Sequence, residues 1–349
     1  MNKVLEDLDR EIISIISKRT ELFVEELKGR GDNPEDIYSP VDKSIQFKLI
    51  EDINKGPVSN DVLKKIYNEL ILCSANIVNP IQVAYLGPIG TFSHMALLEI
   101  FGDSIEGISL NSIPAVFDEV ETGRAPFGVV PVENSTEGGV TYTLDELSDT
   151  DLKIVSEKFL RISYSLLSLC QGLRDIKKLY SHPQPLGQCK EWIRANLPEV
   201  EIHRADSTTQ ASKMALEEGF SAAIASERSA SIYNLRILAN NIEDSSQNYT
   251  RFLVIGRKDN PPTGKDKTSI VCAVKDKPGA LYNMLKSFDN SGINMTKIES
   301  RPDKKKIWEY NFFIDFIGHK DDRVVKNALE EMKEEALFLK VLGSYPSES

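Results

Sequence analysis

Several loops between residues 81 and 258 are rich in neutral side chains that can hydrogen-bond a ligand. Four of them are GPIGTFSH (87–94), PVENSTEGG (131–139), SHPQPLGQC (181–189) and DSTTQA (206–211), and a fifth segment, NYTRF (248–252), leads into a predicted strand. Capping of the following helix explains any one of these loops. Four strand-to-helix loops together are better suited to binding a polar small molecule, because ligand sites in α/β sheets lie where strands end.

Hydroxyl, amide and carboxyl groups in these loops are the candidate binding groups. Thr91 and Ser93 follow a glycine-rich turn at the start of a predicted helix, where free backbone N–H groups favour an anion. Glu133 and Asn134 directly follow an apolar strand. The other neutral candidates are Ser181, Gln188, Ser207, Thr208 and Thr209.

Ser181, His182 and Asp206 could also suggest a hydrolytic triad. The chain lacks a GxSxG turn around a serine, and we therefore reject this interpretation. His182 is expected to be structural or a hydrogen-bond partner. The four cysteines form no CxxC pair and the histidines are equally scattered, so we expect neither a metal site nor a disulfide framework.

Composition narrows the choice of partners. The 349 residues carry a formal net charge of -11, which opposes binding to a phosphate backbone, so nucleic acid is not an expected partner. The first residues, MNKVLEDLDREIIS, lack the apolar core and cleavage site of a secretory signal. The longest charge-free stretch is interrupted by Asn, Pro and His and cannot cross a bilayer as one clean helix. We therefore expect no membrane partner and a cytoplasmic location.

Residues 1–80 are expected to form a helical domain. Apolar residues recur at three- and four-residue steps from Val4 to Phe23, which predicts an amphipathic helix ending near Lys28. Shorter helices predicted around 43–54 and 61–77 cannot cover so long an apolar stripe. We therefore expect a second copy of the chain to pack along it, giving a homodimer or, if dimers pair, a tetramer.

Residues 81–258 alternate short apolar runs with helical patterns, which predicts doubly wound α/β sheets in two lobes. The predicted strands are VAYLG, FGVVPV, ISYSLLSL, KKLYSH, EIHRA, SAAIAS and RFLVIG. Residues 259–267 are a linker. Residues 268–349 predict a βαββαβ order typical of a ferredoxin-like sandwich, with its last helix around 322–339.

The runs YLGPIGTFSH, GVVPVENSTEGGVTYTLD, LYSHPQPLGQC, STTQA, AAIAS and NYTRF resemble, in order, the motifs of prephenate dehydratases. GALY (279–282) and ESRP (299–302) resemble the ACT domain that binds phenylalanine in these enzymes, and residues 1–80 resemble a helical chorismate mutase domain. The whole chain is therefore similar to the bifunctional mutase-dehydratases of phenylalanine biosynthesis. The resemblance implies a multidomain protein with a bilobal, periplasmic-binding-protein-like dehydratase domain.

The resemblance implies decarboxylation of prephenate with loss of its ring hydroxyl as water, giving phenylpyruvate without a cofactor. Carried over from the motif TRF, Thr250 is expected to be hydrogen-bond donor or acid to the leaving hydroxyl. Arg251 either stabilises substrate carboxylate charge or forms an internal salt bridge. Asn134, Ser181 and Gln188 would act beside Thr250, and Glu133 would orient these donors or transfer a proton. Thr91, Ser93, Ser207, Thr208 and Thr209 would bind substrate.

For the ACT segment, the resemblance implies a regulatory phenylalanine site at a dimer interface. Small residues at the start of a predicted helix would let the amino acid approach, and a loop further along would complete the site. The expected residues are Gly279, Ala280, Leu281, Asn294, Glu299, Ser300, Arg301 and Pro302. The alternative interpretation is an ordinary turn and helix cap.

The mutase-like segment departs from its family. Arg19, Arg30 and Ser74 match site residues, whereas Asn2, Ser39, Asp42, Lys43 and Val78 replace the usual polar and charged ones. Val78 cannot hydrogen-bond an ether oxygen, and Asp42 would repel an anionic substrate. We therefore expect weak or absent mutase activity. The alternatives are a fully bifunctional enzyme and a bilobal amino-acid-binding sensor, and Thr250 in its TRF context argues against the sensor.

Overall fold

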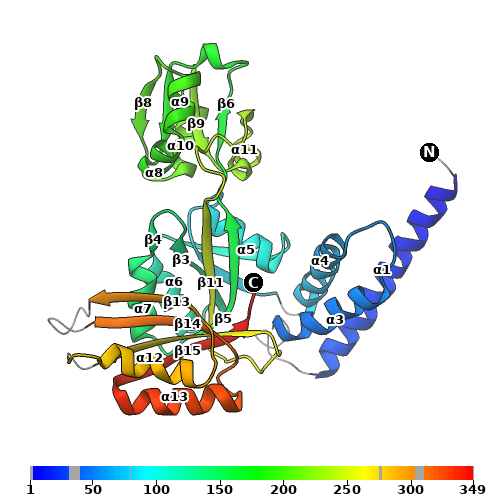
Figure 1. Cartoon of the computed structure of the whole chain (residues 1–349). Coiled ribbons are helices and arrows are strands. Elements are labelled where there is room, and N and C mark those ends of the chain that lie inside the picture. The colour runs from blue at the N-terminus through cyan, green and yellow to red at the C-terminus, as the bar shows by residue number, and fades with distance from the viewer. Residues whose placement is uncertain (1–2, 31–39, 79, 275–276, 303–309, 349) are drawn as a thin grey trace.

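The computed structural model describes residues 3–30, 40–78, 80–274, 277–302 and 310–348. Figure 1 shows a helical N-terminal region, two α/β lobes and a C-terminal domain that lies against the first lobe. None of the helices within the described ranges is both long and apolar enough to cross a membrane.

The N-terminal region contains helices α1 (Lys3–Arg30), α3 (Pro40–Ile53) and α4 (Asn60–Val78). Helix α1 ends two residues beyond the predicted Lys28, and α4 extends the predicted third helix, 61–77, by one residue at each end. Helices α1 and α4 pack together. The first half of α1 projects away from the rest of the chain (Figure 1), and its apolar residues are 48–65% exposed: Val4, Leu5, Leu8, Ile12, Ile13 and Ile15.

The first lobe is built on a mixed sheet in the order β2-β1-β3-β11-β5, with the short β4 added to β3. β1, β2 and β3 are parallel, and β11 is antiparallel to both of its neighbours. The strands are β1 (Gln82–Leu86), β2 (Glu106–Leu110), β3 (Phe127–Asn134), β4 (Gly138–Gly139), β5 (Lys153–Arg161) and β11 (Tyr249–Gly256). The helices are α5 (Phe92–Phe101), α6 (Ile113–Glu121) and α7 (Thr141–Asp149).

The second lobe has a sheet in the order β10-β6-β9-β7-β8. Its strands are β6 (Ser165–Ser168), β7 (Lys178–Ser181), β8 (Glu201–Arg204), β9 (Ser221–Ala225) and β10 (Arg236–Ala239). Its helices are η1 (Leu173–Asp175), α8 (Pro183–Gln188), α9 (Lys190–Asn196), α10 (Thr208–Glu217) and α11 (Glu227–Tyr233).

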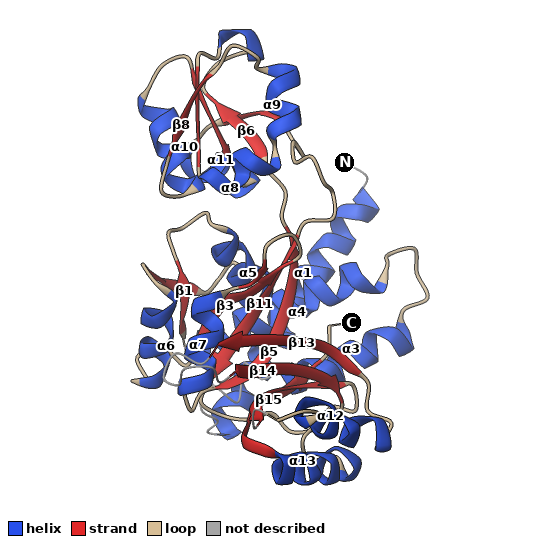
Figure 2. Ribbon diagram, turned by 60° about the vertical axis from the view of Figure 1, so that its left-hand side comes forward, coloured by secondary structure: helices blue, strands red, loops and turns tan. Residues whose placement is uncertain are grey.

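The chain crosses between the lobes twice, from β5 to β6 and from β10 to β11 (Figure 2). The two crossing segments are hydrogen-bonded, with Ile162 N donating to Asn248 O at 2.8 Å and Ile242 N donating to Tyr164 O at 3.0 Å. The predicted strand ISYSLLSL is therefore a strand only in its second half, because its first half belongs to this crossover.

The C-terminal domain has the element order β12 (Asp266–Val274), α12 (Ala280–Asn290), β13 (Met295–Pro302), β14 (Tyr310–Ile317), α13 (Arg323–Glu335) and β15 (Ala336–Pro346). Its antiparallel sheet has the order β13-β14-β12-β15. The prediction that the last helix continues to Leu339 is wrong. From Ala336 onward the chain pairs with β12, beginning opposite Val274, and this pairing ends the helix.

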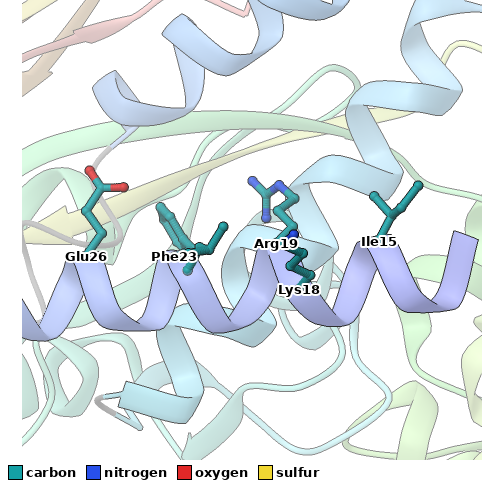
Figure 3. A pocket seen from close by; sticks show the side chains of 6 residues that line it. Ile15, Lys18, Arg19, Phe23 and Glu26 are labelled. Carbon is teal, nitrogen blue, oxygen red and sulfur yellow. The ribbon is translucent and has the colours of Figure 1, made fainter.

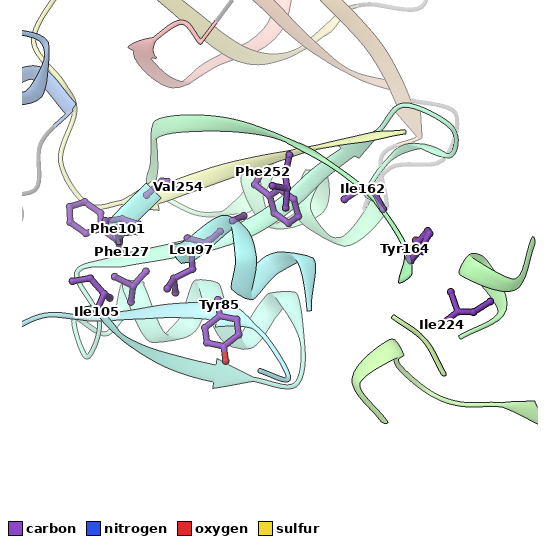
Figure 4. Close-up of a cluster of buried hydrophobic side chains, with 14 of the residues drawn as sticks. Tyr85, Leu97, Phe101, Ile105, Phe127, Ile162, Tyr164, Ile224, Phe252 and Val254 are labelled. Carbon is purple, nitrogen blue, oxygen red and sulfur yellow. The ribbon is translucent and has the colours of Figure 1, made fainter. Parts of the chain in front are cut away.

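Strand β11 is buried on both of its faces. Phe252 and Val254 belong to a core that includes Leu97 and Phe101 of α5 (Figure 4). This core extends to buried residues of α1 and α4 in the helical region. Leu253 and Ile255 point to the other face, where a second core joins α6 and α7 to the C-terminal domain. Consecutive residues of β11 therefore face different domains, which decides where Thr250 and Arg251 point.

Candidate active site

The strongest candidate site begins with a pair of polar residues on neighbouring strands. Asn134, the last residue of β3, lies directly opposite Thr250 near the start of β11. Its side-chain amide donates a hydrogen bond to the Thr250 hydroxyl at 2.9 Å, and the two residues are 8% and 9% exposed. Accepting this bond leaves the Thr250 O–H hydrogen available for a ligand.

The local sequence fixes the orientation of Asn134. Its carbonyl oxygen accepts hydrogen bonds from the backbone N–H groups of Thr136 at 3.0 Å and Glu137 at 3.2 Å, forming a turn of the kind that asparagine favours. A β-bulge lies in β3 just before this pair, since Arg251 faces Glu133 but the next residue, Phe252, faces Pro131, which leaves Val132 as the extra residue of β3. Bulges of this kind redirect side chains and are frequent beside active sites.

Asn134 and three other neutral side chains form a closed ring of hydrogen bonds. Asn134 donates to Asn248 at 2.9 Å, Asn248 donates to Gln188 at 3.0 Å, and Gln188 donates to Thr136 at 3.2 Å. The Thr136 hydroxyl donates back to Asn134 at 2.5 Å. We call Asn134, Thr136, Gln188, Asn248 and Thr250 the interlobe network, because Gln188 comes from the second lobe and Asn248 from the crossover.

The predicted loops 87–94 and 206–211 also meet across the two lobes. Thr209, which is 2% exposed, donates to Ile89 O at 3.2 Å. Ser226 donates to Gly90 O at 2.7 Å. Gly90 has a φ of +88°, and a Cβ there would lie 3.1 Å from the Ser229 hydroxyl, so glycine suits this contact.

The other predicted hydroxyls have local roles within one lobe. Thr91 and Ser207 cap α5 and α10, accepting hydrogen bonds from His94 N and Gln210 N. Ser181 is fully buried and donates to Ile224 O at 2.8 Å within the second sheet. Ser93 is buried in α5, and Thr208 begins α10. None of these five side chains is brought into the interlobe network.

Arg251 does not lie in the interlobe network. Its guanidinium, 6% exposed, donates to Glu157 at 2.9 Å, to Tyr345 at 2.8 Å and to Asp315. Burial lowers the pKa of Arg251, but the surrounding Tyr345, Asp315 and Glu157 outweigh this and raise it. Two roles were expected for Arg251, and the structure supports the internal salt bridge. The guanidinium is hydrogen-bonded to these three side chains at the boundary with the C-terminal domain, so it does not face the interlobe network.

Glu133 also points away from Thr250. Its carboxylate accepts a bond from Lys297 of β13 at 2.8 Å, on the face of β3 opposite to that of Asn134. The expected roles of Glu133, orienting the neutral donors directly or moving a proton among them, do not fit this position. The reason is the alternation of a strand, in which neighbouring residues point to opposite faces.

Burial shifts the pKa of three groups near the junction of the lobes. It raises the pKa of the Cys189 thiol, with Asp244 and Glu243 adding to the effect, and it raises the pKa of Tyr164. Burial also lowers the pKa of His94, whose Nδ1 accepts a hydrogen bond from Gly90 N at 3.3 Å. All three groups are therefore neutral at pH 7, in keeping with the neutral interlobe network.

Sequence reasoning did not single out Thr136, Asn248 or Ser226. Thr136 and Asn248 stand in the motifs ENSTEGG and NYTRF, but single hydroxyl and amide groups cannot be distinguished there from turn residues. Only the return of the chain through the crossover brings Asn248 to Asn134. No cluster of three or more metal-ligating side chains occurs among the described residues.

Three of the predicted mutase-like residues, Arg19, Ser74 and Val78, are described in the helical region, and only Arg19 lines a pocket. That pocket, of about 400 Å³, lies along α1 and is lined by Ile15, Lys18, Arg19, Leu22, Phe23 and Glu26. Figure 3 shows these side chains on α1. The Arg19 guanidinium lies 5.5 Å from the ring centres of both Phe23 and Tyr67. Ser74 is fully buried and donates to Leu70 O of its own helix. Val78 packs against the core.

Other mutase-like positions fall outside the description. The side chain of Arg30, at the end of α1, is not described, nor are those of Asp42 and Lys43 in α3. Asn2 and Ser39 lie outside the described residues altogether.

The predicted regulatory residues lie on α12, β13 and the turn between them. Gly279, with a φ of +80°, precedes α12, Ala280 is buried, and Leu281 packs on the C-terminal core. Asn294 is exposed. Along β13, Ser300 and Pro302 are exposed, whereas Glu299 and Arg301 turn to the first lobe.

Two lobes joined by a double crossover, with neutral hydrogen-bonding groups at their junction, define a ligand-binding or catalytic α/β domain. A model of the family "Prephenate dehydratase" matches residues 83–260, and one of "ACT domain" matches residues 268–334. The chain belongs to the prephenate dehydratase family and carries an ACT domain.

Relatives and solved structures agree with this family. The chain is 46% identical to a bifunctional chorismate mutase/prephenate dehydratase of Aquifex aeolicus, covering 99% of this chain and 97% of that one. It is 41% identical to the protein of the same description in Pseudomonas aeruginosa, over 98% and 95%. A prephenate dehydratase of Arthrobacter aurescens in complex with L-Phe is 33% identical, with a TM-score of 0.72, covering 76% and 90%.

Proposed function

We propose that the protein converts prephenate to phenylpyruvate, carbon dioxide and water, and that Thr250 acts on the departing hydroxyl. The observation that carries this assignment is the buried hydrogen bond from Asn134 to Thr250 at the junction of the two lobes. It leaves the Thr250 O–H as a donor within a neutral network, in a chain that belongs to the prephenate dehydratase family.

The reaction asks for positioning and one hydrogen-bond donor. The electron pair of the breaking carbon–carboxylate bond enters the ring as carbon dioxide leaves, and the pair of the carbon–oxygen bond departs with the hydroxyl. A proton completes the water, and aromatisation supplies the driving force. Thr250 would donate a hydrogen bond to the departing oxygen, while amide groups such as Gln188 and Asn248 would orient the substrate.

The ACT domain would make this activity sensitive to phenylalanine. The element order of the C-terminal domain and its sheet order β13-β14-β12-β15 support a ferredoxin-like sandwich. Gly279 in the left-handed region and the exposed Asn294, Ser300 and Pro302 support an amino-acid site near the start of α12 and along β13. The Arthrobacter relative is described in complex with L-Phe, which is the ligand proposed here.

The helical region is proposed to serve mainly in dimerisation, with weak or absent mutase activity. Arg19 is held between two aromatic rings, and Val78 offers no hydrogen bond where the family has a polar side chain. The exposed apolar stripe of α1 supports a homodimer formed by two such helices. The proposed conversion of prephenate to phenylpyruvate is a biosynthetic reaction, which is consistent with the expected cytoplasmic location.

The test supplies purified protein with prephenate and with chorismate in separate assays and measures phenylpyruvate. We expect rapid formation of phenylpyruvate in the prephenate assay and little or none in the chorismate assay. Comparable rates from both substrates would instead support the fully bifunctional alternative. Binding of phenylalanine without turnover of either substrate would support the amino-acid-binding sensor.

A further inference from the structure

Strand β13 of the ACT domain contacts the first lobe through alternate residues. Lys297, Glu299 and Arg301 are half-buried, whereas Thr296, Ile298, Ser300 and Pro302 are exposed. This period of two places the three charged side chains on one face of the strand. All three contact one short stretch of the first lobe, residues 133–145. This stretch begins with Glu133, and its second residue is Asn134 of the interlobe network.

Each of the three side chains makes a different contact with that stretch. Lys297 pairs with Glu133 at 2.8 Å and also with Glu299 at 3.0 Å, and its side chain is 14% exposed. The Glu299 carboxylate lies over Gly139 of β4 so closely that a Cβ there would come within 2.0 Å of its oxygen. Arg301 donates two hydrogen bonds to Asp145 of α7, at 2.5 and 2.9 Å.

The contacted stretch is held from its other side by the interlobe network. Glu133 and Asn134 are consecutive, and they pair with Gly139 and Gly138 of β4. Glu133 is held by Lys297, while Asn134 donates to Thr250 and accepts from Thr136. Because neighbouring residues of a strand share a rigid backbone, a displacement of Glu133 moves the amide that fixes the Thr250 hydroxyl.

We propose that Lys297, in the ACT domain, is a positioning residue for the dehydratase reaction, acting through Glu133 on Asn134 and Thr250. Glu299 and Arg301 assist by holding β4 and α7 against the same strand. The exposed face of β13 carries Ser300 and Pro302, so an amino acid bound there shifts this contact. This regulatory consequence rests on the proposed function, whereas the positioning of the 133–140 segment does not.

The test compares Lys297→Met, Glu133→Gln and the double variant in the full-length protein. We expect each single variant to lower kcat for prephenate by about 10-fold or more, because misplacement of a catalytic group is costly, with little change in KM. The double variant is expected to be no worse than either single one, and Lys297→Arg to recover most of the rate. Lys320→Met is the matched control, since its pair with Asp259 at 2.6 Å joins the ACT domain to the linker without touching β3.

Two further measurements separate positioning from other roles. Amide hydrogen exchange of residues 132–140 is expected to quicken in Lys297→Met and to stay at the wild-type rate in Lys320→Met, and this readout needs no turnover. Calorimetry is expected to show wild-type phenylalanine binding in Lys297→Met together with weaker inhibition.

Unchanged kcat and exchange in Lys297→Met would overturn the proposal, as would additive losses in the double variant. Loss of phenylalanine binding in Lys297→Met would also overturn it, by making Lys297 a ligand contact. If Lys297→Met does not fold, kcat and the hydrogen exchange of residues 132–140 in Glu133→Gln and Lys297→Arg test the proposal instead. If the wild-type protein does not turn over prephenate, the proposed function fails, and hydrogen exchange still decides the positioning role.

Discussion

The side-chain amide of Asn134 donates a hydrogen bond to the hydroxyl of Thr250 at 2.9 Å, although 116 positions separate the two residues in the chain. The same amide nitrogen also donates to Asn248 at 2.9 Å. The Thr250 oxygen accepts a hydrogen bond from Asn134, so the hydroxyl hydrogen points away from the Asn134 amide. This relationship gives a weakly acidic hydroxyl a defined direction in which to donate.

Replacing Asn134 with Asp should remove this arrangement while keeping the size of the side chain. A carboxylate cannot donate to Thr250 or Asn248, and its charge repels a substrate that carries two carboxylates. We expect kcat/KM for prephenate to fall by about 100-fold or more, as when a single preorganised donor is lost. Steady-state assays of phenylpyruvate measure this, with Asn76→Asp as a control because Asn76 donates to Ser104 O, far from the network. Wild-type kcat/KM in Asn134→Asp would remove the amide from the proposed site.

Arg251 should govern stability more than substrate affinity. Arg251→Met leaves the buried Glu157 paired with Lys267 and takes from the buried Asp315 its ion pair with Arg251, and breaking a buried pair in this way costs about 3–5 kcal/mol. Urea unfolding of the wild type and the variant measures the loss. Arg124→Met removes an exposed pair with Glu119 and should change the unfolding free energy little. A large rise in KM for prephenate with unchanged stability would return Arg251 to the substrate site.

His94 should make stability depend on pH below about 7, the region just above and below its ordinary pKa near 6.5. Its pKa is lowered by burial, so between the folded pKa and the ordinary value near 6.5 the unfolded chain binds a proton that the folded chain does not. The free energy of unfolding therefore falls as the pH drops through this window, and protonation also breaks the bond from Gly90 N. Unfolding at several pH values, compared with His94→Gln, isolates the effect. An unfolding free energy that differs between the two proteins by the same amount at every pH would contradict it.

The apolar stripe of α1 should carry the dimer. Leu8 and Ile12 are 48% and 53% exposed in the single chain. Full burial of such a side chain contributes about 1.5–3 kcal/mol, so burying the remaining half contributes about 1 kcal/mol for each side chain in each copy. Leu8→Glu combined with Ile12→Glu is therefore expected to weaken dimerisation by at least about 100-fold. Sedimentation equilibrium measures this, with Ser14→Glu on the opposite side of the helix as the control. A dimer of undiminished strength in the double variant would place the interface elsewhere.

Helices with strong apolar periodicity could be predicted closely from the sequence. The first helix was expected to end near Lys28 and ends at Arg30, and its unpartnered stripe was visible in the spacing of its apolar residues. Strand β5 was missed, because Glu157 interrupts its apolar pattern. That carboxylate is buried only because Arg251 and Lys267 come from strands distant in sequence, and no local pattern reveals such partners.

The direction of the site residues was harder to predict than their presence. Alternation along a strand implies that Thr250 and Arg251 point to opposite faces, and likewise Asn134 and Glu133. The sequence cannot tell which face is the site, because both are buried, one between the lobes and the other beneath the ACT domain. Capping also uses hydroxyls such as those of Thr91 and Ser207, which a pattern of polar residues cannot distinguish from ligand-binding groups.

The central claim is that the Thr250 hydroxyl assists departure of the substrate hydroxyl. Its most direct test is the rate of phenylpyruvate formation from saturating prephenate by Thr250→Val and Thr250→Ser. Valine keeps the shape and removes the donor, so kcat should fall by at least about 100-fold, while serine should retain most of it. Matched thermal unfolding of the variants controls for the fold. Wild-type kcat in Thr250→Val would contradict the claim.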